Sequence, residues 1–155
     1  MAELRRTFDT AAERYDRVRP IYEAQIFDDL AALAGLDSRS RILEIGCGTG
    51  QATVALAQRG YRITAVELGA RLAEIARRNL ADYRDVEVTV AAFEEWPLAE
   101  QQFDAVVSAN AFHWINRVVR VPKAAEALRS GGSLAVIETW RRPLASEQVL
   151  ARLRS

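Results

Sequence analysis

The sequence predicts an open, doubly wound α/β fold with about five mostly parallel strands, for two reasons. From Arg41 onward, short apolar segments alternate with segments of helical periodicity, and strands separated by helices form right-handed βαβ units in one parallel sheet. A turn with three glycines follows the first apolar segment, as expected where such a strand leads into a helix. The 155 residues, half of them hydrophobic, predict a single domain over 1–155.

The first 36 residues are predicted to form a helical cap. Apolar residues recur at helical spacing from Phe8 to Tyr15, and Arg19-Pro20 ends that segment because a residue before proline avoids the helical conformation. A second apolar stripe runs from Tyr22 to Ala34. Gly35 follows it as a predicted helix C-cap.

Residues 37–140 are predicted to form the α/β core, and 141–155 a short tail. The candidate strands are Arg41–Ile45, Tyr61–Glu67, Val86–Ala91, Phe103–Ala109 and Gly132–Glu138. Helices are expected after Gly50, over Ala70–Ala81, and over Val121–Leu128 with Pro122 in the first turn and a Ser-Gly-Gly turn at 130–132 beyond the end.

The most specific local signal is Leu43-Glu44-Ile45-Gly46-Cys47-Gly48-Thr49-Gly50, an apolar strand that leads through glycines into a helix. Glycine is needed where the backbone turns tightly or where a ligand lies directly against main-chain atoms. Amides at the start of the following helix can donate to such a ligand. We therefore expect Glu44, Gly46, Cys47, Gly48 and Gly50 to form a cofactor-binding loop.

The spacing separates this loop from two other nucleotide-binding loops. A dinucleotide fingerprint needs glycine at its sixth position, where this chain has Gln51, and no Gly-Lys-Ser/Thr follows as in a P-loop. The carboxylate of Glu44 would repel a pyrophosphate but attract a cationic amino-acid moiety, such as that of S-adenosylmethionine. The alternative is that Glu44 only accepts hydrogen bonds from loop amides.

A second acid, Glu67, ends its candidate strand about twenty residues after the glycine loop. In nucleotide-binding βαβ units, an acid at this place accepts hydrogen bonds from ribose hydroxyls. The alternative is a solvated charge at a strand end, and the glycine loop upstream favours the ribose interpretation.

These motifs resemble those of the class I S-adenosylmethionine-dependent methyltransferases, over about Thr7 to Glu138. The Glu44–Gly50 loop is similar to the first motif of that family, and Glu67 to its ribose-binding acid. The segment Phe103-Asp104-Ala105-Val106-Val107 resembles the fourth strand, and Leu128-Arg129-Ser130-Gly131-Gly132 resembles the turn into the fifth. The resemblance implies a Rossmann-like fold, S-adenosyl-L-methionine as cofactor and methyl transfer as the reaction.

The segment 8–20 is similar to the N-terminal helical cap of a branch in which many members methylate small molecules. This resemblance implies that Tyr15 and Arg19 close over the methionine end of the cofactor. The alternative is that Tyr15 packs the helix and Arg19 pairs with a surface acid. Family members usually continue past the fifth strand to complete a seven-stranded sheet, so the resemblance also implies that the C-terminal strands are missing from a chain that stops at Ser155.

The adenine site departs from the family pattern, because Ala92 stands where many relatives have an acid after the third strand. We expect instead that the backbone amide and ring of Phe93 hold the adenine, with Glu94 accepting from its exocyclic amine. Leu68, directly after Glu67, is expected to line the same cofactor site.

The segment after the fourth strand contains Asn110, His113 and Trp114, which face the methyl group in the resemblance. Methyl transfer from a sulfonium needs mainly positioning, and a base only where the acceptor must lose a proton. His113 is the candidate base, since an imidazole serves that role around neutral pH; the alternative is a structural imidazole bonded to the backbone. Trp114 is expected to line the substrate site or to pack in the core, and Cys47 to be a small packing residue without a reactive thiol.

The composition limits the classes of binding partner that the sequence predicts. Lys plus Arg and Asp plus Glu number 21 each, so the sequence predicts no basic field for nucleic acid or for a membrane surface. The single cysteine excludes an internal disulfide and argues against a metal site. Neither a secretory signal nor an apolar segment long enough to span a bilayer is found, which predicts a cytoplasmic protein.

The sequence thus predicts a methyltransferase that uses S-adenosyl-L-methionine and an unidentified, small-molecule acceptor. The second hypothesis is a non-catalytic or incomplete module that binds the same cofactor. The third is an NAD(P)-dependent oxidoreductase, which Gln51 in place of the last fingerprint glycine disfavours. The sequence identifies neither the acceptor atom nor the oligomeric state.

Overall fold

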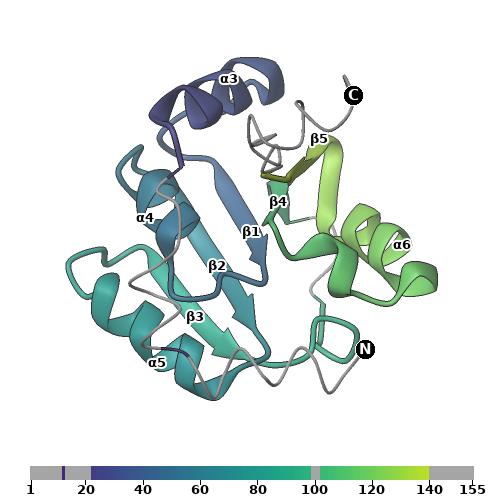
Figure 1. The fold of residues 1–155 in the computed structure, drawn as a ribbon. Coiled ribbons are helices and arrows are strands. Elements are labelled where there is room, and N and C mark those ends of the chain that lie inside the picture. The colour runs from purple at the N-terminus through teal and green to yellow at the C-terminus, as the bar shows by residue number, and fades with distance from the viewer. Residues whose placement is uncertain (1–11, 13–21, 99–101, 140–155) are drawn as a thin grey trace, which may run out of the picture.

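The computed structural model describes residues 12, 22–98 and 102–139. Over these residues it is an α/β structure in which a five-stranded, all-parallel sheet with the order β3-β2-β1-β4-β5 lies between helices (Figure 1). The strands are β1 (Arg41–Ile45), β2 (Arg62–Glu67), β3 (Val86–Val90), β4 (Phe103–Ala109) and β5 (Leu128–Ile137). The helices are α3 (Ala24–Ala34), α4 (Gln51–Ala57), α5 (Ala70–Asn79), α6 (Arg117–Ala127) and the short 3-10 helix η1 (Phe112–Trp114). The predicted fold class is confirmed.

The two faces of the sheet carry separate hydrophobic cores. On one face, Ile42 of β1 packs with residues of α3, α4 and α5. On the other face, Leu43 and Ile45 pack with Phe112 of η1 and Ala124 of α6, and Figure 1 shows α6 apart from the other three helices. Successive side chains of a strand point to opposite faces, so the continuous apolar sequence of β1 serves both cores.

Helix boundaries follow local capping. Gly35 ends α3 in the left-handed conformation with φ +62°, as predicted for a C-cap. The predicted start of the last helix was wrong: α6 begins at Arg117 because the side chain of Asn116 accepts a hydrogen bond from the amide of Val118. Pro122 therefore lies inside the helix and not in its first turn.

The predicted start of the fifth strand was also wrong. β5 begins at Leu128, which pairs with Phe103, and pairing resumes with Ser133 opposite Ala105. The residues between them include Gly131 with φ +77° and form a bulge. The expected Ser-Gly-Gly turn is therefore part of the strand.

Asp104 of β4 connects the amino ends of two neighbouring strands. Its carboxylate accepts hydrogen bonds from the amide of Arg41, at 2.7 Å, and from the guanidinium of Arg129. Partial burial tends to raise the pKa of Asp104, but these two hydrogen bonds and the charges of both arginines outweigh burial, so the pKa is lowered.

The N-terminal cap lies mostly outside the described residues. Ala12 is described, and it is buried against Leu72 and Ile75 of α5. The predictions for Tyr15 and Arg19 fall on residues that are not described. None of the described helices is long and apolar enough to cross a membrane.

Candidate cofactor and methyl-transfer site

The glycine loop leaves the carboxyl end of β1 and passes close to the segment after β4. Gly46, Gly48 and Gly50 have φ angles of +72°, +58° and +96°, a region that favours glycine. A Cβ at Gly46 would lie 2.4 Å from the Cβ of Ala111. The amide of Gly46 also donates to the carbonyl of Val66 at 2.8 Å, so the loop is held against β2 as well.

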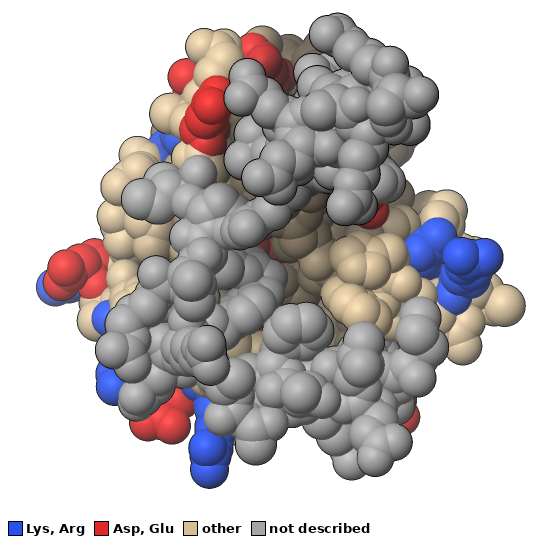
Figure 2. Space-filling model, viewed as in Figure 1, with Lys and Arg blue, Asp and Glu red and all other residues tan. Residues whose placement is uncertain are grey.

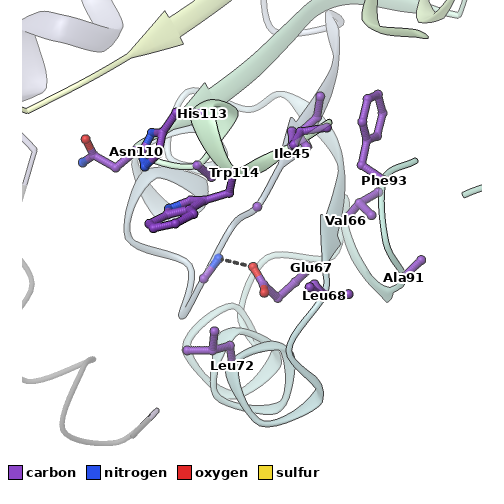
Figure 3. A pocket seen from close by; sticks show the side chains of 14 residues that line it. Ile45, Val66, Glu67, Leu68, Leu72, Ala91, Phe93, Asn110, His113 and Trp114 are labelled. Carbon is purple, nitrogen blue, oxygen red and sulfur yellow. Dashed lines mark hydrogen bonds between the residues drawn. The ribbon is translucent and has the colours of Figure 1, made fainter. Parts of the chain in front are cut away.

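Glu67 at the end of β2 is buried and fastened to the loop. Its Oε2 accepts a hydrogen bond from the amide of Gly48 at 2.8 Å, drawn as the dashed line in Figure 3. Its Oε1 accepts one from the amide of Gly69 at 2.9 Å. The residue is 7% exposed, so it is not a solvated charge at a strand end. A carboxylate offers about four lone-pair positions, so this one group can accept from both loop amides.

These groups line a cavity of about 300 Å³ at the carboxyl ends of β1, β2 and β4, which we call the strand-end pocket. Its volume suits a small molecule. In the close view, Asn110 and His113 lie on one side, Ala91 and Phe93 on the other, and Trp114 lies between His113 and Glu67 (Figure 3). The lining residues are Ile45, Gly46, Gly48, Val66, Glu67, Leu68, Leu72, Ala91, Phe93, Asn110, Ala111, His113, Trp114 and Ile115.

The described surface that is visible in Figure 2 carries few charges near the middle of the view. On the face shown in Figure 2, the visible Lys, Arg, Asp and Glu side chains lie mostly at the outer edge, and uncharged residues form most of the visible described centre. Among the described residues that line the strand-end pocket, Glu67 is the only one of the types Lys, Arg, Asp and Glu.

The structure brings together most of the residues proposed from sequence. Eight of them line the strand-end pocket: Gly46, Gly48, Glu67, Leu68, Phe93, Asn110, His113 and Trp114. Four others do not line it: Glu44, Cys47, Gly50 and Glu94.

Two of these four are buried: Glu44, on β1 before the glycine loop, and Cys47, within it. Glu44 is 1% exposed and lies two residues from Ile42 on β1, so its side chain is on the face that packs against α3, α4 and α5. Cys47 packs in that same core. Burial raises the pKa of the Cys47 thiol well above its usual value, and the charges of Glu44 and Glu67 raise it further, which agrees with a packing residue.

The other two are Gly50, at the end of the glycine loop, and Glu94, in the segment after β3. Gly50 is the N-cap of α4, where a Cβ would lie 3.3 Å from a methyl group of Leu80. Glu94 accepts a hydrogen bond from the amide of Asn116 at 3.0 Å. Its carboxylate therefore supports the turn between η1 and α6. The predicted contact of Glu94 with adenine stays a prediction.

Asn110 holds three chain segments together at the pocket. Its φ of +54° is positive, which asparagine tolerates better than most residues. Its Nδ2 donates to the hydroxyl of Tyr22 at 3.0 Å, and its Oδ1 accepts from the amide and the hydroxyl of Thr139 at 2.8 and 3.1 Å. Its own amide donates to the carbonyl of Ile137.

His113 and Trp114 follow on η1. Their rings pack with centroids 4.8 Å apart and planes at 46°. The Nδ1 of His113 lies 3.7 Å from Oε1 of Glu138, and the two side chains are 47% and 40% exposed. The sequence did not point to Glu138, because Glu138 follows β5 whereas His113 follows β4, and no local pattern connects the two.

Sequence reasoning also missed the apolar walls of the pocket, which are Ile45, Val66, Leu72, Ala91, Ala111 and Ile115. A usable signal existed for Ile45, Val66 and Ala91, which stand at or directly after strand ends. Among the described residues, no group of three or more His, Cys, Asp or Glu residues is placed to hold a metal ion.

A doubly wound parallel sheet, with a glycine loop after β1 and a buried acid at the end of β2, defines the class of α/β proteins that bind nucleosides at the carboxyl edge of the sheet. The family model described as "Methyltransferase domain" matches residues 42–132. The chain belongs to this family, and the resemblance seen in its motifs is confirmed.

Three comparisons illustrate the relationship. An uncharacterized methyltransferase of Mycobacterium tuberculosis is 33% identical over 138 residues, which are 87% of this chain and 53% of that protein. A malonyl-[acyl-carrier protein] O-methyltransferase of Acetivibrio thermocellus is 35% identical over 133 residues, 83% of this chain and 46% of that protein. A crystal structure of a SAM-dependent methyltransferase from Aquifex aeolicus shares the fold, with a TM-score of 0.72 at 16% identity over 87% of this chain and 76% of that one. The chain spans about half the length of the curated relatives it matches.

Proposed function

We propose that this chain is the cofactor-binding core of a methyltransferase that takes a methyl group from S-adenosyl-L-methionine and transfers it to a small-molecule acceptor. The observation that carries the proposal is the buried carboxylate of Glu67, held by the amides of Gly48 and Gly69 inside the strand-end pocket. Membership of the methyltransferase domain family supports the same function.

The residues of the pocket fit the parts of this cofactor. Glu67 has acceptor capacity for the ribose hydroxyls. Leu68 and Phe93 supply apolar surface for the adenine, and the backbone amide of Phe93 is the polar group we assign to its edge. The bare main chain of Gly48 leaves room for the methionine end, since this residue has no Cβ. At Gly46 the missing Cβ leaves room for Ala111.

When bound, the cofactor supplies a methyl group on a sulfonium, which is already activated for displacement. The protein then has to position the acceptor in line with the methyl group and to keep water away. His113 and Trp114 border the pocket on the acceptor side in this proposal. The acceptor in this proposal is a small molecule, which is supported by the name of a relative from Tropheryma whipplei, a demethylmenaquinone methyltransferase.

Calorimetric titration tests the cofactor. We expect the chain to bind S-adenosylhomocysteine and not NAD. Gly48→Val should abolish binding, because a branched side chain would occupy the ligand's approach; Gly60→Val is the matched control, since Gly60 also has a positive φ, of +82°, and does not line the pocket. Binding of NAD in preference to S-adenosylhomocysteine would contradict the proposal.

Methyl transfer from radiolabelled S-adenosyl-L-methionine to small acceptors tests the reaction. Transfer by this chain supports an enzyme. Binding of S-adenosylhomocysteine without any transfer supports the alternative, a module that binds the cofactor without catalysis.

A further inference from the structure

We propose that Lys123 is a positioning residue that orients the backbone amide of Phe93 toward the base of the cofactor and so makes the pocket selective for adenine. The proposal rests on the proposed function and adds to it a residue and a means of base selection. Three contacts of the Lys123 side chain with the segment after β3 carry the proposal. Lys123 is the only lysine of the chain.

The amide of Phe93 is the polar group of this segment that a ligand can use. Phe93 lines the strand-end pocket and is 3% exposed. Its amide donates to no acceptor among the residues that the structure describes. A buried amide without a partner costs free energy, and a ligand with an acceptor atom would remove that cost. In the proposed complex, this acceptor is the ring nitrogen N1 of adenine.

A tight turn fixes the direction of this amide. The carbonyl of Ala92 accepts hydrogen bonds from the amides of Glu95 and Trp96, at 3.0 and 2.9 Å. The peptide unit that joins Ala92 to Phe93 is trans, and in a planar trans peptide the C=O and N–H groups point in opposite directions. The N–H of Phe93 therefore points away from the interior of the turn.

Lys123 holds this turn from the side of α6. Its Nζ donates to the carbonyls of Glu94 and Trp96 at 3.1 and 2.5 Å. The same atom lies 5.4 Å from the centroid of the Phe93 ring. An ammonium group has three donors and is also attracted to the face of an aromatic ring. One side chain therefore fixes two carbonyls of the turn and the ring of the residue whose amide faces the ligand.

A second link joins the turn to the same helix. Oε1 of Glu94 accepts a hydrogen bond from the amide of Asn116, the N-cap of α6, at 3.0 Å. Asn116 and Lys123 lie two helical turns apart, so the turn is attached to α6 at two separate points. Phe93 and Ala124 of α6 belong to one hydrophobic core. The turn is thus held by the helix behind it, and Lys123 supplies most of the polar contacts.

Adenine and hypoxanthine differ at the atom that this amide meets. N1 of adenine carries a lone pair and accepts a hydrogen bond, whereas N1 of hypoxanthine carries a proton. An amide held in place by Lys123 faces a second donor when hypoxanthine is bound, and neither donor is then satisfied. A turn that is free to move lets the amide turn aside, and the preference is lost. Lys123 therefore sets the selectivity for the base as well as the affinity.

Titration calorimetry with S-adenosylhomocysteine and with S-inosylhomocysteine, which carries hypoxanthine, tests this selection. We expect the unaltered chain to bind the adenosyl compound about 20-fold more tightly. Lys123→Met keeps the length of the side chain but removes its charge and donors, and the ratio of affinities should fall to about threefold or less. Lys123→Arg, which keeps a charged donor, should recover most of the ratio.

Arg120→Met is the matched control on α6. Arg120 donates to the carbonyl of Phe112 at 3.1 Å and lies 5.0 Å from the centroid of the Phe112 ring, so it repeats the contacts of Lys123 on a different segment. Arg120→Met should lower the stability to urea without changing the ratio of affinities. Nitrogen-15 relaxation without ligand should give order parameters near about 0.85 for the amides of 93–96 in the unaltered chain and in Arg120→Met, and below about 0.6 in Lys123→Met.

Each outcome decides a separate part of the proposal. Equal affinity of the unaltered chain for the two compounds would refute the role of the Phe93 amide, and this test needs no variant. An equal loss of affinity for both compounds in Lys123→Met, or unchanged order parameters, would show that Lys123 does not orient the amide. Failure to bind S-adenosylhomocysteine would overturn the proposed function and the role toward adenine together, while the relaxation data would still decide whether Lys123 orders the turn.

Discussion

Replacing Glu67 by glutamine separates the hydrogen-bonding role of this residue from its size. The carboxylate accepts from the amides of Gly48 and Gly69 at 2.8 and 2.9 Å while 7% exposed. Glutamine has one acceptor oxygen and an NH2 group that only donates. Whichever way the side chain turns, one of the two amides faces a donor, and acceptor capacity for the ribose hydroxyls is reduced.

We expect Glu67→Gln to lose about 1.5–3 kcal/mol of cofactor binding, the range for hydrogen bonds to a charged group. At 1.4 kcal/mol per tenfold, this is a loss of about 10- to 150-fold in affinity for S-adenosylhomocysteine, measured by titration calorimetry. Urea unfolding without ligand should show a separate loss of about 1–3 kcal/mol for the unsatisfied amide.

Glu87→Gln is the control for Glu67→Gln, because Glu87 is an exposed carboxylate on β3 away from the pocket. It should change neither affinity nor stability measurably. If Glu67→Gln binds S-adenosylhomocysteine as tightly as the unaltered chain, the ribose assignment is refuted. If only stability falls, Glu67 is an anchor of the glycine loop and nothing more.

Three further outcomes are expected. Gly46→Ala should lower the stability to urea more than Gly35→Ala. Both positions have a positive φ, +72° and +62°, but a Cβ at Gly46 would lie 2.4 Å from the Cβ of Ala111, whereas a Cβ at Gly35 would meet nothing within 4 Å. Equal losses of stability would contradict this packing argument. The folded-state pKa of Asp104 is lowered, so its contribution to stability is present above about pH 4 and is lost as the pH falls through the folded pKa. Acid unfolding followed by circular dichroism should therefore depend less steeply on pH in Asp104→Asn. An unchanged unfolding curve would contradict this contribution of Asp104. Cys47, 2% exposed with a raised pKa, should react with dithiodipyridine at pH 8 only after urea is added, and rapid labelling of the folded chain would contradict its burial.

Local chemistry explains which parts of the fold were predictable. The bounds of β1 and β4 match the prediction because each is a short apolar segment between polar or glycine residues. Gly35 caps α3 because a single glycine satisfies the local backbone requirement. The start of β5 was missed because a bulge depends on pairing with β4, which lies far away along the chain.

The candidate site divides in the same way. The glycine loop and Glu67 follow from the order of motifs, since parallel strands bring their carboxyl ends to one edge. The contact of Glu94 with Asn116 and the nearness of Glu138 to His113 have no counterpart in the motifs. Both depend on how loops from different strands meet.

By itself, the sequence determined the alternation of strands and helices, the glycine turn and the acid that follows it, because spacing and residue type act over a few neighbouring positions. Only the tertiary structure decided which acids line the pocket and which are buried or used in capping. Glu44 and Glu67 are both acids on buried strands, yet only Glu67 lines the pocket. The face and register of each strand decide that outcome, and both are set by packing across the whole sheet.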